Sequence, residues 1–199
     1  MCRFIETILV KNNKLENIDY HNFRLNKSRY DFFKLSDILK IENEISVPDE
    51  LNKNEIYRCR IIYSDVIESY EFIPYIKKEI KTLQLVISNT IEYNYKYENR
   101  SCIELLKKDI DADDILILKN GLITDTSIAN IVFRKNDDWF TPRIPLLKGT
   151  QRAKLIDEGK IKPIDIAVKD IHAFDAFVTI NALRPFCEME SLSCDFINM

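Results

Sequence analysis

A single lysine, Lys96, lies among Tyr93, Tyr95 and Tyr97 in the segment EYNYKYENRSCIELL, residues 92–106, just before a predicted helix. An amine enclosed by aromatic rings is poorly hydrated, which disfavours its charged form and makes it a nucleophile toward carbonyl groups. A solvated lysine at the end of a strand fits the same residues. The segment alone leaves both interpretations open, so the other polar segments of the chain have to decide.

Further polar segments stand at the ends of predicted elements. They are HNFRL (21–25), TDTSIAN (124–130), TPR (141–143), LLKGTQR (146–152) and TINALRP (179–185). The chain has three glycines, Gly121, Gly149 and Gly159, which excludes a glycine-rich phosphate loop. The sequence has no G-x-S-x-G segment whose serine could be activated by His21 or His172 as the base, which disfavours a serine hydrolase. A structural role suits His172 better than metal binding.

The composition is that of an ordinary globular protein, because 46% of the 199 residues are hydrophobic and 31% are charged. A net charge of −3 provides no basic surface for nucleic acid. No apolar run reaches the roughly 18 residues of a membrane span, and the opening MCRFIETILVKNNK does not resemble a signal peptide. The five cysteines include no C-x-x-C pair. We therefore expect reduced thiols, a cytoplasmic location, and neither a nucleic-acid nor a membrane partner.

Strands and helices interleave along the chain. A hairpin is predicted for FIETILVKNNKLENI, a helix for DYHNFRLNKSRYDFFKL with Asp19 as its N-cap, and strands for EIYRCRIIYS and ESYEFIPYI. Residues 114–142 predict an antiparallel meander. The predicted class is therefore α/β or α+β. Pro74 and the charges after it indicate a boundary near residues 74–82, giving a small α/β domain (1–78) and a second domain (79–199) that contains Lys96.

The order of the polar segments resembles the class IV aminotransferase family, the pyridoxal 5'-phosphate enzymes of fold type IV. IETI followed by HNFRLNKS is similar to the amino-terminal signature of the family, GLITDTSIANI to its G-x-V-x-E-x-x-x-x-N segment, and TP with LLKGTQR to its cofactor-phosphate region. The resemblance implies a two-domain fold like that of D-amino-acid aminotransferase. Because Met1 stands only four residues before Ile5, a shortened amino-terminal domain is expected.

The resemblance assigns cofactor-binding roles. Lys96 matches the lysine that holds the cofactor as a Schiff base and then moves protons as the catalytic residue. Arg24 matches the arginine that binds the cofactor phosphate, where Gly149, Thr150 and Thr179 are expected to add backbone and hydroxyl groups.

Asp125 matches the carboxylate that faces the pyridine nitrogen and keeps it protonated. The family usually has Glu at this position, so this side chain is one methylene shorter.

The NALRP segment resembles 4-amino-4-deoxychorismate lyases more than aminotransferases and makes Asn181 a substrate-binding candidate, with Thr7 from IETI as a second. Arg58 and Arg60 alternate to one face of a strand, where either could bind a substrate carboxylate or simply be exposed.

The implied reaction releases pyruvate and 4-aminobenzoate, as in folate biosynthesis. The resemblance also implies a small-molecule amine substrate and a homodimer. A branched-chain or D-amino-acid aminotransferase is the alternative, and a catalytically impaired relative that still binds the cofactor is a second.

Overall fold

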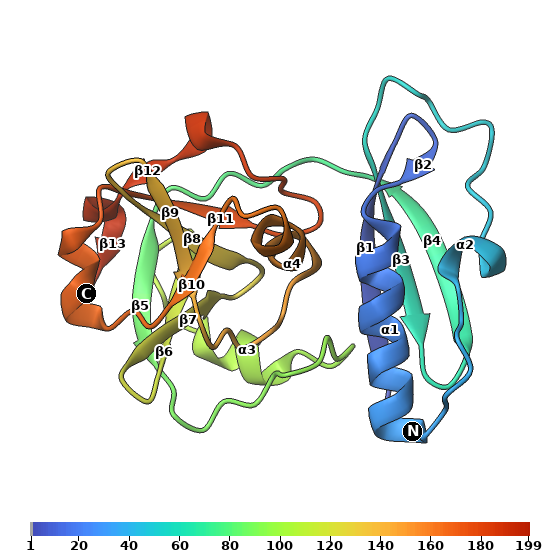
Figure 1. The fold of residues 1–199 in the computed structure, drawn as a ribbon, viewed down its shortest axis with the longest axis horizontal. Coiled ribbons are helices and arrows are strands. Elements are labelled where there is room, and N and C mark those ends of the chain that lie inside the picture. The colour runs from blue at the N-terminus through green and yellow to red at the C-terminus, as the bar shows by residue number, and fades with distance from the viewer. Residues whose placement is uncertain (1) are drawn as a thin grey trace. The chain divides into compact units, whose positions relative to one another are not determined.

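The computed structural model describes residues 2–199 and divides the chain into two compact units (Figure 1). Unit 1 comprises Met1–Lys77 and Tyr95–Asn99, and unit 2 comprises Lys78–Asn94 and Arg100–Met199. The segment that carries Lys96 therefore groups with unit 1, whereas the sequence assigned it to the second domain. Hydrogen bonds and aromatic contacts with the first strand explain this grouping.

Unit 1 contains an antiparallel sheet of four strands in the order β2-β1-β3-β4. The strands are β1 (Phe4–Lys11), β2 (Lys14–Leu15), β3 (Tyr57–Tyr63) and β4 (Ile67–Pro74). Asn12 and Asn13 link β1 to β2 with φ angles of 51° and 56°, and a two-residue hairpin turn of this type requires such positive angles. The predicted hairpin is confirmed.

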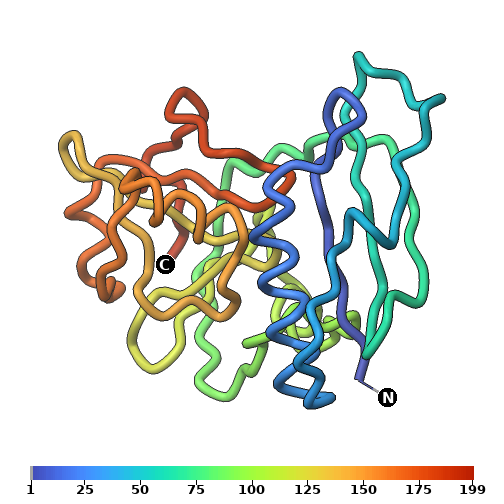
Figure 2. Tube along the Cα trace, turned by 45° about the vertical axis from the view of Figure 1, so that its right-hand side comes forward, coloured from blue at the N-terminus to red at the C-terminus, as the bar shows by residue number. Residues whose placement is uncertain are grey.

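Helix α1 (Ile18–Phe33) runs beside β1, as the tube in Figure 2 shows, and the short α2 (Ile41–Glu44) follows it. Leu25 of α1 is fully buried with Phe4, Ile8 and Val10, which alternate along β1 toward the helix. Burying each such side chain contributes about 1.5–3 kcal/mol. The predicted N-cap at Asp19 is wrong: the cap position is Asn17, in the left-handed region with φ 54°, and Asp19 lies within the first turn.

Unit 2 is built on a larger mixed sheet whose main path is β10-β9-β8-β7-β6-β5-β13, with β11 pairing with β8 and β12. The strands are β5 (Leu83–Ile87), β6 (Asp114–Lys119), β7 (Leu122–Thr126), β8 (Asn130–Lys135), β9 (Asp138–Pro142), β10 (Lys162–Ile164), β11 (Ala176–Ile180), β12 (Leu192–Ser193) and β13 (Ile197–Asn198). The helices are α3 (Ser101–Leu106) and α4 (Thr150–Asp157), with 3-10 turns η1 (Val168–Ala173), η2 (Glu188–Glu190) and η3 (Cys194–Phe196). Strands β6 to β9 form the predicted meander.

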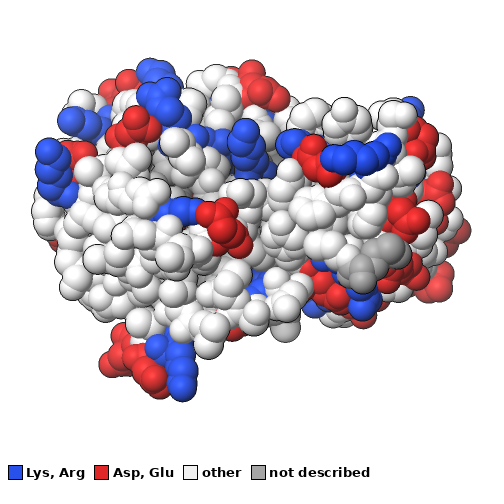
Figure 3. Space-filling model, turned by 90° about the horizontal axis from the view of Figure 1, so that it is seen from below, with Lys and Arg blue, Asp and Glu red and all other residues white. Residues whose placement is uncertain are grey.

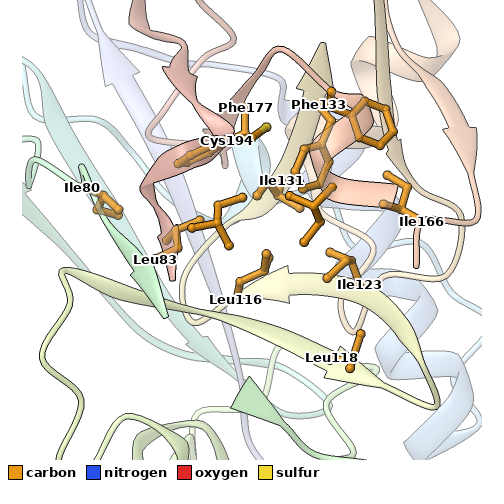
Figure 4. Close-up of a cluster of buried hydrophobic side chains, with 13 residues drawn as sticks. Ile80, Leu83, Leu116, Leu118, Ile123, Ile131, Phe133, Ile166, Phe177 and Cys194 are labelled. Atoms are coloured by element: carbon orange, nitrogen blue, oxygen red, sulfur yellow. The ribbon is translucent and has the colours of Figure 1, made fainter. Parts of the chain in front are cut away.

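Strand β8 is buried on both faces. Ile131 and Phe133 belong to the hydrophobic cluster drawn in Figure 4, whereas Val132 packs with Trp139 and Leu155 in a second cluster. Alternate side chains of a strand point to opposite faces, so one strand serves both clusters. The start of β8, where Asn130 lies, is therefore held by packing on both faces of the strand.

The fold is the mixed α/β arrangement that the sequence predicts. On the face shown in Figure 3, basic and acidic side chains are interspersed among uncharged residues, in keeping with the net charge of −3. Within residues 2–199 no helix is both long and apolar enough to cross a membrane.

Candidate functional site

Lys96 lies at the centre of a three-residue turn. The N–H of Tyr97 donates to the carbonyl oxygen of Tyr95 at 2.9 Å, and Lys96 does not have a positive φ, which defines the common inverse γ-turn. The carbonyl oxygen of Lys96 accepts from the N–H of Ile5 at 2.9 Å, and Phe4 forms an isolated bridge with Tyr97. The backbone around this lysine is therefore fixed to the beginning of β1.

The neighbouring tyrosines anchor this turn to the core of unit 1. The rings of Tyr95 and Tyr97 lie 6.3 and 5.4 Å from that of Phe4, and Tyr95 also meets Phe32 edge-on at 4.8 Å. The hydroxyl of Tyr95 donates to Asp31 at 2.7 Å, and this bond, with burial, raises the pKa of Tyr95 to about 12. These rings thus hold the backbone on either side of Lys96 in place.

Arg24 is held by a carboxylate that the sequence prediction did not include. Its Nε lies 2.8 Å from Oε1 of Glu6 and its Nη2 2.6 Å from Oε2, which makes a bidentate ion pair. The Nδ1 of His21 lies 2.6 Å from the same Oε2. Burial by itself would raise the pKa of Glu6, but the charge and hydrogen bonds of Arg24, with those of His21, lower it to about 2. The carboxylate is therefore ionised at neutral pH.

The positive charge of Lys96 acts on His21 and contributes to its lowered pKa. Burial lowers the pKa of His21, the hydrogen bond and charge of Glu6 oppose that effect, and the positive charges of Arg24 and Lys96 add to the lowering. The net shift is downward, which favours a neutral imidazole that donates from Nδ1 to the carboxylate. The lysine and the arginine singled out from the sequence thus lie in the same part of unit 1.

Thr7, Arg58 and Arg60 share the face of the unit 1 sheet that points away from α1. Thr7 pairs with Arg60 across β1 and β3, and Arg58 and Arg60 alternate with the buried residues of β3. Arg60 lies 3.6 Å from Glu71 and 3.8 Å from Glu98. The Nε of Arg58 is buried and has no hydrogen-bond partner among the described residues. The structure therefore distinguishes the two arginines.

In the β7–β8 hairpin of unit 2, Asp125 is paired with Asn130, and both side chains form hydrogen bonds with the backbone of Leu147. Asn130 Nδ2 donates to Oδ1 of Asp125 at 2.7 Å and to the carbonyl oxygen of Leu147 at 2.8 Å. The N–H of Leu147 donates to Oδ2 of Asp125 at 2.8 Å. The TDTSIAN and LLKGTQR segments are thus joined through their polar groups.

Asp125 is buried, with 5% of the residue exposed. Burial raises its pKa to about 6, while the hydrogen bonds from Leu147 and Asn130 and the charge of Arg152 act in the opposite direction. Arg152 is itself buried, with Nη2 2.8 Å from the carbonyl oxygen of Pro142 and Nε 3.3 Å from Thr141 Oγ1. The TP and LLKGTQR segments therefore meet at a buried cation next to the carboxylate.

Gly149 and Thr150 form the start of α4, directly after this loop. A Cβ on Gly149 would overlap Oδ1 of Asn130, so the close approach of the two segments requires glycine here. Thr150, the first residue of α4, is buried. The first N–H groups of a helix have no partner within the helix, which makes this end suited to an anion.

The late TINALRP segment lies beside the same hairpin. Thr179 is in β11, opposite Ile131 of β8, and is partly buried. Nδ2 of Asn181 donates to the carbonyl oxygen of Ile128 at 3.0 Å, and its Oδ1 accepts from the N–H of Leu183 at 2.8 Å. Asn181 therefore orders the turn that follows β11, in addition to any contact with a ligand.

Glu6, His21 and Asp31 were not among the site residues predicted from the sequence. A signal for Glu6 was present, because it interrupts the apolar alternation of Phe4, Ile8 and Val10 on the side of β1 that faces α1. A charged residue at such a position requires a partner. No comparable sequence signal marked Asp31.

The model of the amino-transferase class IV family matches residues 3–192, and the chain belongs to this family. A protein of Haemophilus influenzae of uncharacterised function is 40% identical over 187 residues, which are 92% of this chain and 99% of that protein. A protein of Schizosaccharomyces pombe named "Putative aminodeoxychorismate lyase" is 31% identical over 83 residues, 39% of this chain and 36% of its own length.

Two solved structures illustrate the range of the fold. A "putative 4-amino-4-deoxychorismate lyase" from Haemophilus somnus 129pt is 32% identical, with a TM-score of 0.84 over 94% of this chain and 98% of that one. A "hypothetical aminotransferase" from Mycobacterium tuberculosis, solved with alpha-ketoglutarate and PMP bound, has a TM-score of 0.78 over 98% of this chain and 81% of that one. At 13% identity the second comparison concerns the fold alone.

The residues present fit pyridoxal 5'-phosphate, the cofactor of this family. In unit 1, Lys96 supplies an amine and Arg24 supplies donors for an anion; in unit 2, taken by itself, the start of α4 is also suited to an anion. A carboxylate can accept about four hydrogen bonds, and Asp125 interacts with the amide of Asn130 and the backbone N–H groups of Leu147 and Leu146, so it retains capacity for a ring N–H.

Proposed function

We propose that this protein is a pyridoxal-phosphate-dependent 4-amino-4-deoxychorismate lyase, which releases pyruvate and 4-aminobenzoate for folate biosynthesis. The observation that carries the proposal is the likeness to the Haemophilus somnus structure, which is 32% identical and extends over 98% of that chain. The NALRP segment, quoted above as lyase-like, supports the same choice.

In this proposal each predicted site residue has one role toward the cofactor. Lys96 would hold the cofactor until the substrate amine displaces it, and its freed neutral amine would then move the proton at the amine-bearing carbon of the substrate. Arg24, Gly149, Thr150 and Thr179 bind the phosphate.

The ionised Asp125 keeps the pyridine nitrogen protonated. The bound cofactor supplies the electron sink that makes cleavage possible. Asp125 can serve in this way above about pH 6, where its carboxyl is ionised.

Arg58 is the better of the two arginine candidates for the substrate carboxylate. Arg60 already lies near two glutamates, at 3.6 and 3.8 Å, whereas the buried Nε of Arg58 has no hydrogen-bond partner among the described residues. An arginine with unsatisfied donors gains most from a planar carboxylate ligand. Thr7, on the same face, and Asn181 are proposed as further substrate contacts.

A homodimer and a cytoplasmic location complete the proposal. Both follow from the family resemblance and the composition, and neither is needed for the assignment of individual residues. The molar mass in solution, measured by light scattering, tests the dimer.

A side-by-side assay tests the reaction. The purified, cofactor-loaded protein is given aminodeoxychorismate, and pyruvate and 4-aminobenzoate are measured; it is then given 2-oxoglutarate with a panel of L- and D-amino acids, and glutamate is measured. We expect 4-aminobenzoate and pyruvate in equal amounts without amino transfer. Amino transfer without 4-aminobenzoate would make the protein an aminotransferase, and cofactor binding without either reaction would make it a catalytically impaired relative.

A further inference from the structure

We propose that Glu6 is a positioning residue that fixes the guanidinium of Arg24 for the cofactor phosphate, and that His21 in turn fixes Glu6. This inference rests on the proposed function, in which Arg24 binds that phosphate. It adds two residues to the site that lie within unit 1 and were identified from their geometry.

The contact between Glu6 and Arg24 restrains the orientation of the guanidinium. Two parallel bonds, at 2.8 Å to Nε and 2.6 Å to Nη2, engage one edge of the planar group. A fork of this kind allows one arrangement in the plane, whereas a single bond would permit rotation. Two of the five N–H donors of Arg24 are thereby committed to Glu6, and the other donors point along the remaining edges of the group.

His21 restrains Glu6 from a second direction. His21 and Arg24 are three residues apart on α1, so their side chains lie on one face of the helix. Nδ1 of His21 is 2.6 Å from Oε2 of Glu6, the oxygen that also receives Nη2 of Arg24. Both Glu6 and His21 have 0% exposed side chains, so water does not compete for these bonds.

A buried arrangement of this kind is costly unless its geometry serves a purpose. Removing a carboxylate and an arginine from water costs several kcal/mol, and apolar residues could fill the same space at least as favourably. The pair fixes a cationic donor on the helix next to the Lys96 turn. A pre-oriented donor loses less entropy when it binds an anion.

The test separates the phosphate from the rest of the cofactor. Pyridoxal lacks the phosphate and cyclises to a hemiacetal in solution, but this cyclisation is the same for every variant. The change between variants in the ratio of the two dissociation constants therefore isolates the contribution of the phosphate contacts. Both are titrated into the purified full-length protein, and the absorbance of the bound chromophore is followed.

Glu6→Gln keeps the shape of the side chain, but its amide nitrogen then faces a donor of Arg24 or His21. We expect the ratio in favour of pyridoxal 5'-phosphate to fall about 10- to 100-fold, with pyridoxal affinity unchanged.

His21 provides a second variant that leaves the charge pair intact. His21→Leu removes the donor to Glu6, and a smaller fall in the same ratio is expected. His21→Asn places an amide N–H close to the position of Nδ1 and should restore the ratio. A purely structural role for His21 would not produce this rescue.

A matched control comes from the same helix. Arg29 of α1 also pairs with a carboxylate, with Nη2 2.9 Å from Oδ2 of Asp37. Asp37→Asn therefore removes another ion pair of the same helix, one whose carboxylate is 67% exposed, and should leave the ratio unchanged.

Wild-type protein that binds neither compound contradicts the proposed function itself. Wild-type protein that prefers pyridoxal 5'-phosphate, with the same preference in Glu6→Gln and His21→Leu, overturns the positioning role alone. Equal losses of affinity for both compounds would also overturn it, since they indicate a general defect. If Glu6→Gln does not fold, as judged by circular dichroism, the two His21 variants decide.

Discussion

The carbonyl oxygen of Lys96 accepts a hydrogen bond from the N–H of Ile5 at 2.9 Å. The next residue along β1, Glu6, binds Arg24 through both of its carboxylate oxygens. Two consecutive residues of one strand thus hold the backbone of the proposed catalytic lysine and the side chain of the proposed phosphate-binding arginine. The relative placement of these two groups within unit 1 is fixed by the geometry of β1.

The bond between Tyr95 and Asp31 is expected to stabilise the Lys96 turn. Tyr95→Phe keeps the ring contacts with Phe4 and Phe32 and removes only the hydroxyl. Because Asp31 is partly exposed, we expect a loss of about 1 kcal/mol in the free energy of unfolding and slower attachment of the cofactor to Lys96. Urea unfolding and the rate of absorbance change on adding pyridoxal 5'-phosphate measure the two effects.

Tyr70→Phe is the control, since Tyr70 lies on β4 and is 44% exposed. It should match the wild type in both measurements. Identical behaviour of Tyr95→Phe and Tyr70→Phe would show that the hydroxyl of Tyr95 does not hold the turn.

Gly149 is expected to contribute to stability because any side chain at this position would overlap the amide of Asn130. Gly149→Ala places a methyl group where Oδ1 of Asn130 now lies, and we expect a loss of about 1–3 kcal/mol in the free energy of unfolding. Urea unfolding of Gly149→Ala, Asn130→Ala and the double variant forms a double-mutant cycle. The double variant should be more stable than the sum of the single effects predicts. Strict additivity would contradict the steric explanation.

The raised pKa of Asp125 predicts a specific pH dependence of stability. The pKa is about 6 in the folded protein against 3.8 as the ordinary value, so between these values the folded state binds more protons than the unfolded state. Stability therefore falls as pH rises through this range and is level above about pH 6. Relative to Asp125→Asn, which does not titrate, the wild type should lose about 2 kcal/mol between pH 4 and pH 7.

The measurement is urea unfolding of both proteins without cofactor, at several pH values in that range. The difference between the two unfolding free energies removes the contribution of every other titrating group. A difference that stays constant with pH, or that moves in favour of the wild type as pH rises, would exclude a raised pKa at Asp125.

The two arginines of β3 are expected to differ in their effect on substrate binding. Arg58→Gln should raise KM for the carboxylate substrate about 10- to 100-fold, since a charge-assisted contact is lost, while cofactor absorbance is unchanged. Arg60→Gln is the matched control, because Arg60 sits two residues away on the same face and already lies near Glu71 and Glu98. Steady-state kinetics decide between them. A larger increase for Arg60→Gln would reverse the assignment.

The fold was largely predictable because its elements carry strong local signals. The apolar alternation of FIETILV and the two asparagines after it specify the β1–β2 hairpin, and the spacing of apolar residues specifies α1. The N-cap was predicted wrongly, since Asp19 is a common capping type, whereas the actual cap residue Asn17 adopts a left-handed conformation without a side-chain bond. Local propensity does not reveal this conformation.

The site was less predictable because its bonds join distant positions. The contact of Tyr95 with Asp31 spans 64 residues, and that of Leu147 with Asp125 spans 22. Periodicity shows which residues are buried but not which polar groups meet. The grouping of the Lys96 segment with unit 1 was not predicted for the same reason: the hydrogen bond between Lys96 and Ile5 joins residues that are far apart in the sequence.

We propose that Lys96 is the lysine that holds the cofactor, and labelling of the protein tests this directly. The purified protein is incubated with pyridoxal 5'-phosphate, reduced with borohydride and digested, and the modified peptide is located by mass spectrometry. We expect the phosphopyridoxyl group on Lys96 at close to one per chain, and none at that position in Lys96→Arg. Labelling of exposed lysines such as Lys27 without labelling of Lys96 would contradict the account.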